Sequence, residues 1–172
     1  MEQRPRILIV EPNRSYAGVL ARRLSEAGYR IGIADCAATA MAELYRLPVD
    51  LVLAELNMPH LGGAELARTI RDDITLCDLP IMFITGKSKP SGAVRAYVAG
   101  ADDVILKPFH FEVLFARIER RLARAQSLKR LMHDNATLDA RVVERAIAIG
   151  ELKDRLAASE AQLHRLAATA AK

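Results

Sequence analysis

Five polar residues stand directly behind short apolar runs of the sequence, where their side chains could form one polar centre. Glu11 follows the first run, Glu55 and Asn57 follow the third, Thr85 follows the fourth and Lys107 follows the fifth. If the runs are strands of one parallel sheet, their carboxyl ends meet at a crevice, which is where such sheets place function. That crevice would then hold two carboxylates, a hydroxyl and an ammonium group.

The apolar runs have the length and composition of buried strands. Their hydrophobicity is nearly continuous, which is typical of strands that are covered on both faces, as parallel strands are. We therefore predict five strands, at residues 7–10, 30–34, 51–54, 81–84 and 104–106.

Stretches with helical periodicity separate these strands. Gly28 and Gly100 are placed to end two of the helices, because glycine accepts the left-handed conformation that closes a helix. The alternation of strand and helix predicts an α/β fold with a doubly wound parallel sheet. The predicted helices cover residues 13–27, 37–46, 63–72 and 90–99.

The last third of the chain is predicted to be one long helix. No proline follows Pro108, and residues 111–168 are rich in Ala, Leu, Arg and Glu, which are good helix formers. We therefore divide the chain into a compact domain at residues 1–122 and a helical extension at residues 123–172. A heptad fits the extension, with Leu128, Asn135, Val142, Ile149, Leu156, Leu163 and Ala170 at a and Leu131, Leu138, Arg145, Leu152, Ser159 and Leu166 at d.

The heptad favours a dimeric coiled coil between two copies of the chain, continuous with the last helix of the domain. Asn135 at an a position is a polar residue of the kind that fixes register, whereas Arg145 and Ser159 interrupt the seam. The alternative is a helical hairpin that folds back at residues 133–135 or at Gly150 and buries the same residues within one chain.

Composition excludes a membrane protein. No apolar run approaches the roughly 20 residues that a membrane-spanning helix needs. The N-terminus is short and charged, unlike a signal peptide, so we predict a cytoplasmic protein. Cys36 and Cys77 lack metal-ligand spacing and are expected to be free thiols.

The net charge of +4 arises in residues 110–172, but it does not predict nucleic-acid binding. Neither a helix-turn-helix nor an aromatic platform accompanies the basic residues. The cluster Arg117, Arg120, Arg121 and Arg124 is expected to form a solvated helix face.

Several motifs together resemble the receiver domain of bacterial response regulators, over roughly residues 5–122. These are Ile7-Leu-Ile-Val10, Asp50-Leu-Val-Leu-Ala-Glu-Leu-Asn-Met-Pro59, the Gly62-Gly63 turn, Ile84-Thr85, Gly100-Ala-Asp-Asp103 and Leu106-Lys-Pro-Phe109. The resemblance implies a flavodoxin-like sheet with strand order 2-1-3-4-5.

Receivers of this kind accept a phosphoryl group on an aspartate at the end of the third strand. The resemblance implies that Thr85 matches the hydroxyl residue that contacts the phosphoryl group. Lys107 matches the lysine before a cis proline, and Asn57 matches the backbone carbonyl that contacts magnesium. The family also uses an acidic pair after the first strand to hold magnesium, which prefers oxygen ligands.

Three positions depart from this pattern. Glu55 stands at the phosphoacceptor, Glu11 and Pro12 replace the acidic pair, and Val104 replaces the aromatic residue that turns inward when the family switches. Proline has neither a carboxylate nor an amide proton, so it removes a metal ligand. We therefore predict that the domain is not phosphorylated and needs no cofactor, with magnesium at the family-equivalent positions Glu11, Glu55 and Asn57 as the alternative.

Two interpretations of the role of Glu55 remain open. It is either a structural partner of Lys107 in an abandoned site or a mimic of the phosphorylated aspartate. The first is favoured, because a carboxylate lacks the extra charge and oxygens of a phosphoryl group.

These observations predict a non-enzymatic signalling module, an atypical receiver of two-component-type signalling that acts through homodimerisation and an unidentified signalling protein. As in the family, the protein-binding face is expected to comprise the fourth helix, fifth strand and fifth helix. One alternative is the regulatory front of a larger enzyme, such as a histidine kinase or a cyclic-dinucleotide phosphodiesterase or cyclase. A conventional phosphorylatable regulator is the other main alternative, and a DNA-binding protein is a weaker one.

Overall fold

The computed structural model describes residues 4–59, 62–86 and 90–170. Five strands, β1 (Arg6–Val10), β2 (Arg30–Ala34), β3 (Leu51–Glu55), β4 (Ile81–Thr85) and β5 (Asp103–Leu106), alternate with five helices. The helices are α1 (Arg14–Glu26), α2 (Ala37–Arg46), α3 (Gly63–Asp72), α4 (Pro90–Val98) and α5 (Phe111–Ala170). Every predicted strand and helix is confirmed, with ends that differ by at most two residues.

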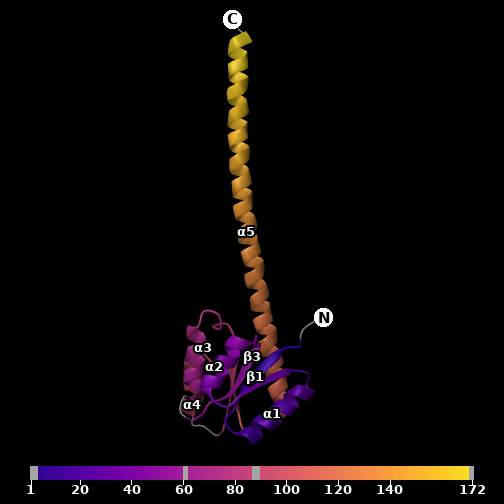
Figure 1. The fold of residues 1–172 in the computed structure, drawn as a ribbon, viewed down its shortest axis with the longest axis vertical. Helices are drawn as coiled ribbons and strands as arrows, with labels where there is room; N and C mark the ends of the chain where they lie inside the picture. Colours follow the sequence, from indigo (N-terminus) through magenta and orange to yellow (C-terminus); the bar gives the residue numbers. More distant parts are fainter. Residues whose placement is uncertain (1–3, 60–61, 87–89, 171–172) are drawn as a thin grey trace. The chain divides into compact units, whose positions relative to one another are not determined.

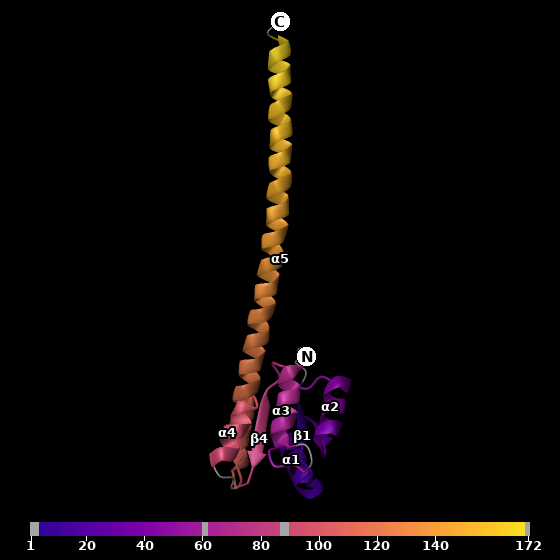
Figure 2. The same ribbon diagram turned by 90° about the vertical axis from the view of Figure 1, so that its left-hand side faces the viewer.

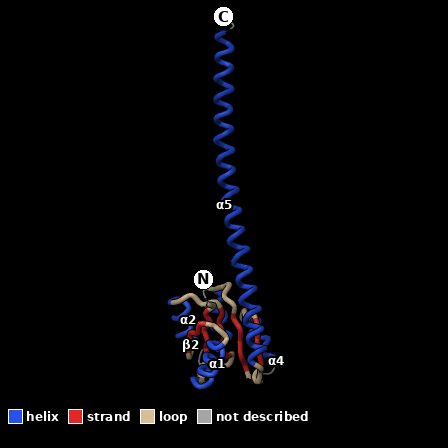
Figure 3. The backbone as a smooth tube through the Cα atoms, turned by 90° about the vertical axis from the view of Figure 1, so that its right-hand side faces the viewer, coloured by secondary structure: helices blue, strands red, loops and turns tan. Residues whose placement is uncertain are grey.

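All strand pairs are parallel, and the sheet order is β2-β1-β3-β4-β5. The paired strands β1 and β3 are labelled in Figure 1. The doubly wound sheet and its predicted strand order are therefore confirmed. Two apolar clusters, one on each face, bury it from both sides. Helices α2, α3 and α4 cover one face, whereas α1 and the first turns of α5 cover the other (Figures 2 and 3).

Two glycines end helices as predicted. Gly28 after α1 has φ of +94°, and Gly100 after α4 has φ of +101°. Residues with a Cβ rarely adopt such angles, so glycine allows the chain to leave each helix and enter the next strand.

The chain divides into two compact units, at residues 1–126 and 127–172. Helix α5 is continuous through residues 133–135 and Gly150, so the hairpin alternative is wrong. None of the helices in the described part of the chain is long and apolar enough to cross a membrane.

Candidate functional site

The sheet brings the predicted polar residues together because its strands are parallel. Glu55 and Thr85 are the last residues of β3 and β4, while Glu11 and Lys107 directly follow β1 and β5. Glu11, Glu55 and Lys107 line a hollow of about 570 Å³, together with Pro12, Tyr16 and Asn57.

Lys107 occupies the centre of this site. Its Nζ lies 2.8 Å from Oε2 of Glu55 and 3.5 Å from Oε2 of Glu11, so one ammonium bridges two carboxylates. The ring of Tyr16 covers the same ammonium, with its centroid 4.0 Å away. Burial alone would lower the pKa of Lys107, but the hydrogen bond and charge of Glu55, with Tyr16 and Glu11, raise it above its usual value.

The other oxygen of each carboxylate is held by the backbone. Oε1 of Glu11 accepts a 2.9 Å hydrogen bond from the amide of Asn13, and Oε1 of Glu55 accepts a 3.0 Å bond from the amide of Asn57. Glu11 is only 6% exposed. Both carboxylates are thus fixed at one oxygen by the chain and at the other by Lys107.

Thr85 is fully buried, and its partner is Asn57. The side-chain amide of Asn57 donates a 3.0 Å hydrogen bond to Oγ1 of Thr85. The sequence suggested only a role for the backbone carbonyl of Asn57, so this bond was not predicted. The peptide bond between Lys107 and Pro108 is cis.

Val104 lies away from this polar centre. It is 9% exposed and belongs to the apolar cluster beneath α2, α3 and α4. The side chain at the predicted switch position is therefore part of the hydrophobic core.

The donor set of the site does not fit magnesium. Magnesium requires several oxygen ligands in octahedral geometry. Pro12 supplies no side-chain oxygen, and both remaining carboxylates share the Lys107 ammonium. Within the described residues, no group of three or more His, Cys, Asp or Glu side chains could hold a metal ion.

Two further site features escaped sequence reasoning. Tyr16 lies on the first turns of α1 and reaches Lys107, which follows β5. Burial raises the pKa of the Tyr16 phenol, an effect that the nearby Lys107 charge opposes. The second feature is the bridge from Lys107 to Glu11.

The predicted arginine face is partly wrong. Arg117 and Arg121 are half-buried and pair with Asp103, at 3.1 and 3.7 Å. Arg120 and Arg124 are exposed as predicted. An aspartate at the start of β5 therefore fixes the first turns of α5 against the sheet edge.

A patch of exposed apolar side chains spans three neighbouring elements, α4, β5 and α5. Its members are between 46% and 78% exposed. We call it the α4–β5–α5 patch, and it consists of Val94, Tyr97, Val98, Leu106 and Val113.

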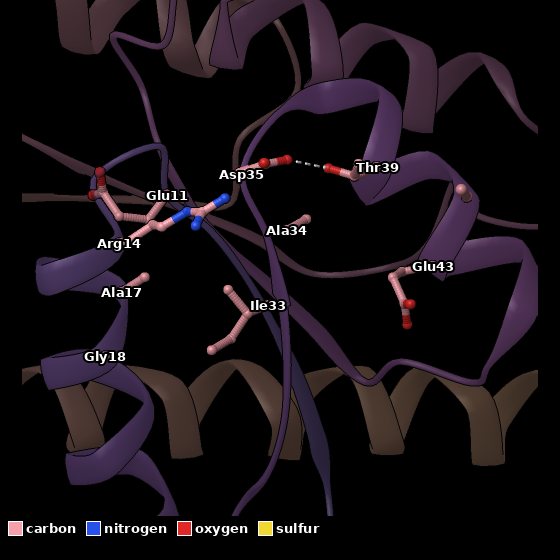
Figure 4. Close-up of a pocket in the computed structure, with 10 residues that line it drawn as sticks. Glu11, Arg14, Ala17, Gly18, Ile33, Ala34, Asp35, Thr39 and Glu43 are labelled. Carbon is pink, nitrogen blue, oxygen red and sulfur yellow. Dashed lines mark hydrogen bonds between the residues drawn. The ribbon is translucent and has the colours of Figure 1, made fainter.

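A second cavity of about 530 Å³ lies beside the site, between α1, β2 and α2 (Figure 4). Ile33 and Ala34 line it together with small residues of the two helices. At its polar end Arg14 points toward Asp35, which accepts a 2.9 Å hydrogen bond from the hydroxyl of Thr39. The cavity shares Glu11 with the central site but none of its other polar residues.

Known proteins of one family resemble this chain over its compact domain. The model of the response regulator receiver domain matches residues 7–119. The transcriptional regulatory protein YvcP of Bacillus subtilis is 37% identical over 119 residues, which cover 69% of this chain and 49% of that protein. The solved signal receiver domain of a histidine kinase from Syntrophus aciditrophicus is 32% identical, with a TM-score of 0.65, and covers 69% of this chain and 90% of that one.

One similarity covers nearly the whole chain. A probable cyclic di-GMP phosphodiesterase of Vibrio cholerae is 29% identical over 157 residues, which cover 91% of this chain and 35% of that protein. This chain spans about half the length of the curated relatives that it matches, from 35% to 61%.

Proposed function

Because this chain belongs to the family of response regulator receiver domains, we propose that it is an atypical receiver that is not phosphorylated and signals through dimerisation and protein contacts. The observation that carries this proposal is the bridge from Lys107 to Glu55 and Glu11. In a phosphorylatable receiver the lysine would bond the phosphoryl group and two acidic residues would hold magnesium. Here both remaining acids neutralise the lysine instead.

Glu55 acts as a structural partner rather than as a mimic of phosphoaspartate. Its two oxygens are committed to Lys107 and to the amide of Asn57. The hydroxyl of Thr85 bonds Asn57. A mimic would be expected to engage the Thr85 hydroxyl, as the phosphoryl group does in the family.

The proposed output surface is the α4–β5–α5 patch together with the heptad of α5. Five large apolar side chains in the patch remain exposed, and burying them against a partner would be favourable at about 25 cal/mol per Å². The partner is a second copy of this chain or a signalling protein, and the module needs no catalysis of its own.

Phosphorylation chemistry tests this proposal. The protein is incubated with acetyl phosphate and magnesium, and its intact mass is measured. We expect no added phosphoryl group in the wild type. The positive control carries Glu55→Asp and Pro12→Asp, which restore the family's acceptor and second acid. A phosphoryl adduct on wild-type Glu55 would show a conventional regulator and reject the proposal.

A second candidate function rests on the Vibrio cholerae relative, whose similarity continues into the long helix. In that case residues 1–172 would be the regulatory front of a larger signalling enzyme, with α5 as the connecting helix. Reading the gene beyond codon 172 separates the two: an open frame that encodes a catalytic domain supports this candidate, and a stop codon rejects it.

A further inference from the structure

Helix α5 carries apolar residues on two faces beyond residue 126. The first face is the heptad, here called the seam, and its large side chains are 41% to 65% exposed. The seam consists of Leu128, Leu131, Leu138, Val142, Ile149, Leu152 and Leu156. The second face is here called the stripe, and its residues recur every three or four positions. It consists of Met132, Ala136, Ala140, Val143, Ile147 and Gly150.

The stripe lies almost opposite the seam. With 3.6 residues per turn, the centre of the stripe is turned by roughly 150° around the helix from the centre of the seam. Met132, Val143 and Ile147 are 50%, 60% and 59% exposed in the single chain. A coiled coil that buries the seam would therefore leave the stripe in water.

Gly150 points to a contact outside the single chain. Glycine in a helix interior costs about 1 kcal/mol relative to alanine. A Cβ added at Gly150 would meet no atom within 4 Å. Packing within this chain thus gives no reason for glycine at this position.

We propose that the stripe packs against the stripe of a second copy in antiparallel orientation, with the two-fold axis near residues 141 and 142. This register sets Met132 against the partner's Gly150 and Ala136 against the partner's Ile147. Ala140 then faces the partner's Val143. Each layer joins a large side chain to a small one, which is how helix faces interdigitate without voids.

Charge favours the same orientation. Glu151 follows the stripe at one end, and the basic residues Lys129 and Arg130 with His133 stand at the other. Antiparallel pairing brings Glu151 beside the partner's His133 and Arg130. Parallel pairing would instead set Glu151 against the partner's Glu151 and Ile147 against the partner's Ile147.

The stripe and the seam are independent surfaces, because they occupy opposite sides of the helix. A dimer joined through the seam keeps two stripes free for further copies. The stripe contact therefore adds association beyond the dimer of the proposed function, and it does not depend on that dimer.

Cysteine cross-linking tests the stripe directly. In a background with Cys36→Ser and Cys77→Ser, one chain carries Ala136→Cys and another carries Ile147→Cys. The two are mixed at high concentration and treated with a short bismaleimide. We expect cross-linked pairs that contain one chain of each kind and few pairs of one kind, because like positions would be about 16 Å or more apart along the helix axis.

A blocking variant and a matched control complete the experiment. Gly150→Leu on both chains should abolish the mixed cross-link, because the leucine side chain takes the space of the partner's Met132. The helix itself is not weakened, because leucine has a higher helix propensity than glycine. Thr137→Leu adds the same side chain on the charged face and should leave the cross-link unchanged. Absence of the mixed cross-link in the unblocked chains, or its survival in Gly150→Leu, would overturn the proposal.

Discussion

The side-chain amide of Asn57 donates a 3.0 Å hydrogen bond to the hydroxyl of Thr85, across the carboxyl ends of β3 and β4. Thr85 has no exposed surface, whereas Asn57 is exposed. The bond therefore satisfies a hydroxyl that water does not reach.

Asn57→Ala should destabilise the domain by about 1 kcal/mol, because it leaves a buried hydroxyl without its donor. Thr85→Val removes the hydroxyl itself, and the exposed Asn57 amide can then bond water, so the cost should be smaller. Urea unfolding of both variants and of the double variant measures the coupling between the two residues. If the effects of the two substitutions on the free energy of unfolding are strictly additive, the hydrogen bond contributes nothing to stability.

Gly63 should be intolerant of any side chain. A Cβ at this position would lie 2.7 Å from the carbonyl oxygen of Glu55 and 2.7 Å from Cε1 of Phe83. Gly63→Ala should therefore cost about 1 to 3 kcal/mol in unfolding free energy. It would also displace the backbone that carries Glu55.

Gly18 provides the matched control for this substitution. It lies within α1, and a Cβ there would meet nothing within 4 Å. Gly18→Ala should raise stability by up to about 1 kcal/mol through helix propensity. Equal effects of the two alanine substitutions would contradict the close approach at Gly63.

Much of this architecture follows from local pattern. The strands at Ile7, Leu51 and Ile81 are recognisable because a strand covered on both faces needs nearly continuous apolar residues. Gly28 and Gly100 mark helix ends by the same kind of local rule. The convergence of Glu55 and Lys107 then follows, since parallel strands end at one edge.

Contacts made by long side chains could not be predicted in this way. Arg71 donates hydrogen bonds to the carbonyls of Cys77, Leu79 and Gly100, and it pairs with Asp102. Nothing in the spacing of the sequence links it to those four groups, because a flexible side chain finds its partners only after the backbone is placed. Tyr16 over Lys107 is the same kind of contact.

Alkaline pH should weaken the domain through Lys107. Its pKa is raised by the hydrogen bond and charge of Glu55, in spite of burial, so the folded state binds the proton more tightly than the unfolded state. The resulting stabilisation is complete below the unfolded pKa of about 10.4 and is lost as pH rises through the folded pKa. The free energy of unfolding of Lys107→Met, measured in urea, should therefore fall less steeply than that of the wild type as pH rises above about 10.

Tyr29 and Tyr45 do not confuse this comparison. Tyr29 and Tyr45 also have raised pKa values, the first mainly from burial and the second mainly from the hydrogen bond to Asp73. Both titrate in wild type and in Lys107→Met alike. Tyr16 does not, because the Lys107 charge opposes the rise of its pKa, so the difference between the two curves reports Lys107 together with its contact with Tyr16. Parallel curves would indicate that Lys107 gains no stabilisation from its partners.

The seam should hold two copies in parallel. Ile149 occupies an a position and is 54% exposed in the single chain. In a parallel, in-register coiled coil it faces the partner's Ile149. Ile149→Cys, in the background that lacks the natural cysteines, should therefore form a disulfide-linked dimer on mild oxidation. Glu144→Cys on the charged face should not, and it serves as the control for random collision.

This cross-link separates the seam from the stripe. In the antiparallel stripe register two copies of residue 149 lie about 22 Å apart along the helix, too far for a disulfide. Light scattering gives the companion measurement, because deletion of residues 125–172 should remove the coiled-coil dimer. If the Ile149→Cys chain stays unlinked, or if the shortened domain remains as dimeric as the full chain, the long helix does not dimerise through its heptad.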